Sequence, residues 1–223
     1  MWSQLFANIV WSDIGTATLA TLYMVGVSTL MAFVLGLPLG VLLLLWSKDN
    51  LMKNSWLYQT LSVIVNIVRS VPFIILLIAL IPLTNLIVGT SIGVTAAIVP
   101  LVIGAAPFYA RIVETALREV DHGVIEAAQS MGASTWTIVW RVLLPEARPG
   151  LIAGITITAV TLISYSAMSG VIGGGGLGDL AVRYGYERFQ TNVMLVTTAL
   201  MVVLVQILQM CGDRLVHHFS RRT

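Results

Sequence analysis

The chain has 223 residues, of which 57% are apolar and only 10% are charged, and its formal net charge is +2. An ordinary soluble domain carries roughly a quarter of its residues as charged side chains, so this composition excludes a soluble globular protein. The apolar surplus must face lipid, and we expect an all-α integral membrane protein.

The first residues carry no sign of a removable leader. The segment from Met1 to Trp11 lacks a basic flank before an apolar core and a small-residue cleavage site. We therefore expect no cleaved signal peptide, and the first span is expected to stay.

Five apolar runs approach or exceed the length of about 20 residues that a helix needs to cross the hydrocarbon layer. They lie at about 16–46, 57–83, 91–110, 150–172 and 193–211. We interpret 1–223 as one transmembrane domain, with its longest polar stretch at about 111–149. Five helices are too few to enclose a passage, so a pore is expected to need a second copy or another partner.

Basic residues gather on one side of these five runs. That side holds Lys48, Lys53, Arg111, Arg118, Arg141, Arg148, Arg214, Arg221 and Arg222, whereas only Arg183 and Arg188 fall on the other and Arg69 lies within a run. Nine against two predicts, by the positive-inside rule, an amino terminus outside and a carboxyl terminus in the cytoplasm.

Small residues recur at helical spacing in two of the runs. The pairs Gly36 with Gly40 and Gly150 with Gly154 each place two glycines on one helix face, where backbones can approach closely. The pattern fits packing within the chain or contact with another subunit. The single cysteine, Cys211, lies in an apolar run, where we expect a buried, inert thiol.

The polar stretch predicts two short helices with a bend between them. The first covers about 121–131, with Val124, Ala127, Ala128 and Met131 on one face. Gly132 suits the left-handed position after a helix, Ser134 can cap the second helix, and Pro145 is expected to close it. Spacing alone leaves two readings open, a solvated loop or a rigid element that transmits force from a docked partner.

The same stretch carries a motif. Glu126-Ala127-Ala128 is followed after three residues by Gly132 and after nine more by Val142-Leu143-Leu144-Pro145. This pattern resembles the EAA loop of ABC importer permeases (EAA-x3-G-x9-I-x-LP), with Val in place of Ile as the one departure. The stretches VNIVRSVPFIILL, VGTSIGVTAAIVPLVIGAAPFYAR and SYSAMSGVIGGGGLGDL are similar to the permeases of methionine-uptake ABC transporters.

The resemblance implies a type I ABC importer permease fold of five transmembrane helices with a cytoplasmic coupling helix, in a bacterial inner membrane. It implies a homodimer that moves methionine by alternating access, with two cytoplasmic ATPase subunits and an extracytoplasmic substrate-binding protein. ATP and Mg would be bound by the ATPase, and this chain would hold no cofactor. Carried onto this sequence, the residues coupled to the ATPase are Glu126, Ala127, Ala128, Gly132, Leu144 and Pro145. Glu126 would pair with a basic group or remain a solvated charge.

Arg69 is the one cation inside an apolar run, where an unpaired charge costs several kcal/mol. Pro72 follows it and is expected to break the helix. Arg69 would then either order the backbone near this break or a membrane interface, or contact the transported substrate.

Along the fourth run, Thr158, Thr161, Tyr165 and Met168 recur at helical spacing, with Ser164, Ser166 and Ser169 nearby. Such a face can line a passage, or it can supply hydrogen bonds between helices. The matching region of the methionine family lies at the gate between the two subunits, which implies that Met168 is a flexible apolar plug.

Other classes fit less well. This sequence has no G-x-x-x-x-G-K-[ST] loop for ATP, no catalytic or metal-ligating constellation and no feature that suggests nucleic acid as a partner, so we expect no enzyme. Gly173, Gly175 and Gly178 are expected to form a turn leading into an outer surface, 179–190, where a binding protein can dock. The alternatives are an importer of another amino acid or a small osmolyte, and a stand-alone secondary transporter.

Overall fold

The computed structural model describes residues 10–48 and 51–220, and every regular element in these ranges is a helix. The predictions made on Met1 to Ile9 and on Arg221 and Arg222 lie outside the described residues. The elements are α2 (Trp11–Trp46), α3 (Ser55–Ser70), α4 (Phe73–Ala79), α5 (Ile81–Val88), α6 (Val94–Arg118), α7 (His122–Ser130), α8 (Thr135–Ile138), η1 (Val139–Leu143), α9 (Leu144–Glu146), α10 (Arg148–Gly170), α11 (Gly176–Leu180), η2 (Ala181–Tyr186) and α12 (Thr191–Phe219).

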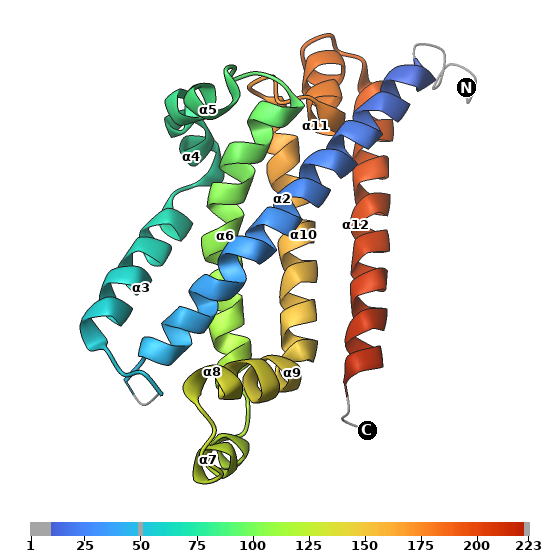
Figure 1. Ribbon diagram of the computed structural model, residues 1–223. Coiled ribbons are helices and arrows are strands. Elements are labelled where there is room, and N and C mark those ends of the chain that lie inside the picture. Colours follow the sequence, from blue (N-terminus) through green and yellow to red (C-terminus); the bar gives the residue numbers. More distant parts are fainter. Residues whose placement is uncertain (1–9, 49–50, 221–223) are drawn as a thin grey trace.

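Four helices, α2, α6, α10 and α12, are each long and apolar enough to span a bilayer. In Figure 1, α2 crosses obliquely over α6 and α10, while α7, α8 and α9 lie at one end of the bundle and α5 and α11 at the other. The helices α3 and α4 make a fifth span only as a broken pair. Four of the five predicted runs are therefore continuous spans.

The second predicted run, 57–83, is not one helix. It comprises α3, α4 and part of α5, and α4 is turned by 103° from α3. The break lies at Val71, which is extended (φ −77°, ψ 126°), and at Pro72. Proline has no N–H to donate and disfavours a helical residue before it, so the chain turns here although it stays apolar.

The third run continues beyond its predicted end at 110, and α6 reaches Arg118. Glu114, which lies beyond the predicted end of the run, is therefore part of this helix and is buried there. Asp13 and Asp213 also lie within α2 and α12, near their ends. Arg111 and Arg118, three residues before and four after Glu114, neutralise its charge along the helix.

The glycine pairs pack helices of the same chain. A Cβ at Gly40 would lie 2.5 Å from the carbonyl oxygen of Ala110, so α2 and α6 touch through their backbones. A Cβ at Gly154 would lie 2.5 Å from Cγ2 of Ile112, which brings α10 equally close to α6. Contact within the chain explains both pairs. Cys211, by contrast, is exposed on α12, so the expectation of a buried thiol is wrong.

Candidate functional site

The polar stretch forms two short helices joined by a bend, at the end of the bundle where α6 stops (Figure 1). Asp121 caps α7 by accepting a hydrogen bond from the N–H of Gly123 at 2.7 Å. Gly132 follows α7 in the left-handed region, with φ 78°. Ser134 then accepts from the N–H of Thr137 at 3.4 Å and caps α8. The local prediction of helix, glycine bend and capped helix is confirmed.

Helix α7 turns most of its surface away from the rest of the chain. Of the face predicted to be apolar only Ala128 is buried, whereas Val124 is 44% exposed and Met131 is 81% exposed. Ala127 and Glu126 are exposed as well, and Glu126 has no ion pair within the described ranges. An exposed helix with uncovered apolar side chains, here Val124 and the following Met131, at the free end of a membrane bundle is typical of a surface that a partner protein covers.

The second helix runs from α8 through η1 into α9. Leu144 and Pro145 are partly buried and begin the helical turn α9, and the chain then passes through Ala147 (φ −78°, ψ 0°) into α10. The helical backbone is continuous from Thr135 through η1 to Glu146, so the second helix ends one residue after Pro145, close to its predicted end. Trp136 and Trp140, before this turn, are 52% and 65% exposed.

A buried carboxylate ties α6 to α3 just before this region. Glu114 is 2% exposed, and its Oε2 lies 2.5 Å from Nη1 of Arg111 while its Oε1 lies 2.7 Å from Nη2 of Arg118. Tyr58, on α3, donates its hydroxyl to Oε1 at 3.3 Å. The second amino group of Arg111 reaches α3 too, donating to Ser62 at 2.8 Å and to Asn66 at 2.9 Å.

Replacing Glu114 by glutamine is expected to destabilise the protein by about 3 kcal/mol or more, because it leaves two clustered arginines without their counter-charge. Glu119→Gln is the matched control, since Glu119 ends the same helix and is exposed. Thermal unfolding in detergent measures both. Equal melting temperatures for the two variants would show that the cluster contributes nothing.

Arg69 and Pro72 flank the break between α3 and α4. Arg69 lies in the last turn of α3 and is exposed in the single chain. Its guanidinium carbon lies 5.7 Å from the centroid of the Phe108 ring on α6. Pro72 precedes the first residue of α4, Phe73, whose ring stacks on Tyr165 of α10 at 4.1 Å and 2°.

The predicted face of α10 is partly open. Met168 is 45% exposed and Ser164 is exposed, while Thr161 and Tyr165 are half-buried. The hydroxyl of Thr161 donates to the carbonyl of Ile157 in its own helix at 2.8 Å, so it does not join α10 to another helix. Thr161, Ser164 and Met168 recur at intervals of three and four, which makes one continuous stripe on the surface of this chain.

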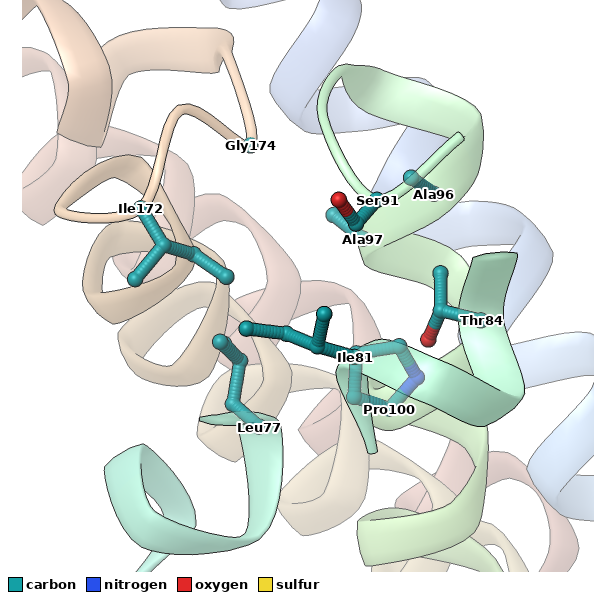
Figure 2. A pocket seen from close by; sticks show the side chains of 9 residues that line it. All are labelled: Leu77, Ile81, Thr84, Ser91, Ala96, Ala97, Pro100, Ile172 and Gly174. Atoms are coloured by element: carbon teal, nitrogen blue, oxygen red, sulfur yellow. The ribbon is translucent and has the colours of Figure 1, made fainter. Parts of the chain in front are cut away.

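The glycine segment after α10 forms the predicted turn. Gly173, Gly175 and Gly176 all have φ near 80°, and the carbonyl of Gly173 accepts from the N–H of Gly93 at 3.0 Å. Figure 2 shows a small cavity between this turn and α4, α5 and α6, into which Leu77, Ile81 and Ile172 point. Its volume is about 10 Å³, room for about one water, so it does not hold a cargo molecule.

On the surface predicted for docking, 179–190, the carboxylate of Asp179 pairs with Arg183. This hydrogen bond raises the pKa of Arg183, which keeps its charge. Phe189 is 87% exposed with φ 55°, and Tyr186 is 70% exposed. Two exposed aromatic side chains, one on a left-handed backbone, give this end of the bundle an apolar tip.

Two parts of the site were missed by sequence reasoning, the carboxylate of Glu114 and the ring of Phe108. The spacing of Arg111, Glu114 and Arg118 was a usable signal, because residues three and four apart share a helix face. Nothing in the sequence linked Phe108 to Arg69, which lies on another helix.

The chain matches, over residues 36–223, the family model described as the inner membrane component of binding-protein-dependent transport systems. It is 56% identical over 207 residues to a probable D-methionine transport system permease protein of Vibrio cholerae, covering 93% of this chain and 92% of that one. It is 49% identical over 222 residues to the methionine import system permease protein of Bacillus subtilis, covering all of both chains.

Solved structures show the same fold. A chain of the MetNI methionine ABC transporter in an inward-facing conformation superposes with a TM-score of 0.93 and is 51% identical, with 95% of this chain and 98% of that chain covered. An amino acid ABC transporter crystallised with histidines superposes with a TM-score of 0.71 over 100% of this chain and 95% of that chain. Its identity of 20% makes it a likeness of fold alone.

Proposed function

Because the chain belongs to the family of binding-protein-dependent transport system inner membrane components, a family of ABC transporter permeases, we propose that it forms the methionine path of an ATP-driven importer. Two copies would make the passage, and each would seat α7 in one cytoplasmic ATPase subunit. The observation that carries this proposal is the exposed helix α7, with Val124 and Met131 uncovered and a bend at Gly132, at the free end of the bundle.

The mechanism follows from this arrangement. Closure of two ATPases on ATP, with its Mg, moves the two α7 helices, and each bend passes the motion to α6 and α10. Membrane halves that rock in this way open the passage to one side at a time. ATP and the loaded binding protein must each prefer one conformation, since a ligand shifts an equilibrium only by its differential affinity.

The test is reconstitution in vesicles with the ATPase subunit and the substrate-binding protein. We expect methionine uptake only with ATP and the loaded binding protein, and two ATPase subunits for each pair of permease chains. A cysteine-reactive label tests the orientation, after Cys211→Ser removes the native thiol. Labelling of a cysteine introduced into α7 from the extracytoplasmic side would contradict the proposal.

Enlarging the side chain at the proposed gate is expected to change flux. Met168→Trp should lower ATP-driven uptake about tenfold, because a rigid ring cannot fold away as a thioether chain does. Met210→Trp is the matched control, since Met210 on α12 is 49% exposed against 45% for Met168. Uptake and leak of labelled methionine measure both variants. Normal flux and normal leak in Met168→Trp would remove this residue from the passage.

A stand-alone secondary transporter is the rival from another class. Such proteins usually place carboxylates deep within their spans for proton or ion coupling. Glu114 lies four residues before the end of α6 and not deep within the span, and its carboxylate is paired with two arginines. Uptake that persists without ATP and follows a proton or sodium gradient would favour this rival.

A further inference from the structure

Arg69 has no acidic partner in the described ranges. The salt bridges there join Glu114 to Arg111 and Arg118, and Asp179 to Arg183. The guanidinium carbon of Arg69 lies 5.7 Å from the centroid of the Phe108 ring, a distance at which a cation and an aromatic face attract. This contact orients the group but leaves its N–H donors unused.

The positions of Phe108 in α6 and of Arg69 in α3 indicate how deep the Arg69 guanidinium lies in the membrane. In α6, which has 25 residues, Phe108 lies 14 positions after Val94 and 10 before Arg118. At 1.5 Å per residue these positions are about 21 Å and about 15 Å from the two ends of the helix. The charged part of α6 begins at Arg111, three residues after Phe108. Arg69 itself lies 14 positions after the first residue of α3, which is about 21 Å along that helix. The guanidinium therefore lies inside the hydrocarbon layer, which is about 30 Å thick.

This depth decides what surrounds the group. A cation facing lipid inside the hydrocarbon layer costs several kcal/mol, so charged side chains at such positions face a watery cavity or an opposite charge. Arg69 is exposed in the single chain. Its exposed side therefore belongs to the passage, where an anion can reach it.

The neighbouring aromatic groups connect Arg69 to the stripe on α10. Gly104 lies one turn from Phe108 on α6, and a Cβ at Gly104 would lie 3.4 Å from the ring of Phe73. Phe73 in turn stacks on Tyr165, three residues before Met168. Phe108, Phe73 and Tyr165 thus belong to neighbouring parts of the bundle between Arg69 and the stripe on α10, and Phe108 and Tyr165 are only half-buried.

Toward the α7 end, the polar seam between α3 and α6 has an excess of positive charge. Arg69, Arg111 and Arg118 contribute three positive charges and Glu114 one negative charge, which leaves +2. A passage with walls of one sign raises the local concentration of the opposite charge. A carboxylate released from Arg69 would therefore still be attracted by the net positive charge of this seam.

We propose that the guanidinium of Arg69, held by Phe108, binds the carboxylate of an amino-acid cargo within the membrane. A planar guanidinium matches a carboxylate with two parallel hydrogen bonds. The half-buried rings of Phe108 and Tyr165 supply apolar surface for the cargo side chain, and the buried ring of Phe73 supports Tyr165 from behind. The inference deepens the proposed function and rests on it.

The test uses the full complex with its ATPase and binding protein in vesicles. Arg69→Gln should lower ATP-driven methionine uptake about ten- to a hundredfold, the effect of losing hydrogen bonds to a charged group. ATP hydrolysis stimulated by the loaded binding protein should persist, and Arg69→Lys should restore part of the uptake. Arg214→Gln, an exposed arginine on α12, is the matched control and should transport normally.

A second measurement needs no variant. Labelled methionine is titrated onto the detergent-solubilised permease and ATPase complex without binding protein. Norleucine should compete, whereas the amino alcohol made from it, which has no carboxylate, should not. Equal competition by the two compounds would overturn the proposal.

Three other results would contradict it as well. Arg69→Gln with wild-type uptake would show that the residue is not needed. Loss of uptake together with ATP hydrolysis and thermal stability would make Arg69 a residue of the fold only. A defect confined to vesicles with anionic lipid would assign the site to a lipid phosphate. If the unaltered complex fails to take up methionine with ATP, the proposed function itself is wrong.

Discussion

Gly132→Val is expected to abolish ATP-driven uptake while the protein stays inserted in the membrane and the assembled complex still hydrolyses ATP. Gly132 has φ 78°, a conformation that costs an ordinary L residue about 1–2 kcal/mol and a β-branched residue more. No atom lies within 4 Å of a Cβ built there, so the strain is in the backbone alone. The bend would relax, and α7 would point elsewhere. Uptake and ATP hydrolysis are measured on the same vesicles. The readout is the number of methionine molecules transported for each ATP hydrolysed.

Gly132→Asn separates backbone shape from side-chain size. Asparagine tolerates the left-handed region, so this variant should keep most of the uptake that valine loses. Equal uptake by the valine variant, the asparagine variant and the original protein would contradict the role of the bend in coupling. Equal loss in both variants would point to a contact made by the glycine itself.

Gly40→Leu is expected to prevent stable folding of the bundle. A Cβ at this position would lie 2.5 Å from the carbonyl oxygen of Ala110 and 2.5 Å from Cβ of Val113, distances that real side chains do not adopt. The obstacle is partly backbone, so α2 would have to move away from α6. Overpacking of this kind costs about 3 kcal/mol or more. Thermal unfolding in detergent and the yield of monodisperse protein measure the effect.

Gly26→Leu is the matched control on the same helix. Gly26 is exposed, and no atom lies within 4 Å of a Cβ built there. A leucine at this position would face lipid, where it is well accommodated. The contrast between the two variants isolates the α2 and α6 contact. Similar melting temperatures for both variants would show that the contact between α2 and α6 accommodates a larger side chain without loss of stability.

Hydropathy predicted the long spans because composition alone decides which helices can face lipid. Hydropathy treated α3 and α4 as one span, because an average over residues does not report where the chain turns. Val71, at the break, is as apolar as its neighbours. The proline at 72 marked the break but not the angle of 103°, which depends on how α4 packs beside α6 and α10.

Local chemistry predicted the bend at Gly132 and the cap at Ser134, because both depend on residues within one turn. The predicted end of the second helix at Pro145 is one residue short of the observed end at Glu146, because a proline stops the helix only after the residues that precede it are already helical. The cluster around Glu114 and the contact of Arg69 with Phe108 join residues more than 35 positions apart, so only the fold brings them together.

The three left-handed glycines of the turn after α10 limit how this end of the molecule can be redesigned. Gly173, Gly175 and Gly176 each have φ near 80°, and a Cβ at Gly176 would also meet Thr21 at 2.6 Å. A combinatorial library that randomises these positions would consist mostly of misfolded clones. An engineer who wants a new docking specificity should leave the turn intact and vary Tyr186, whose side chain is 70% exposed. At Phe189, where φ is 55°, the choice should be limited to residues that tolerate the left-handed region, such as asparagine or glycine.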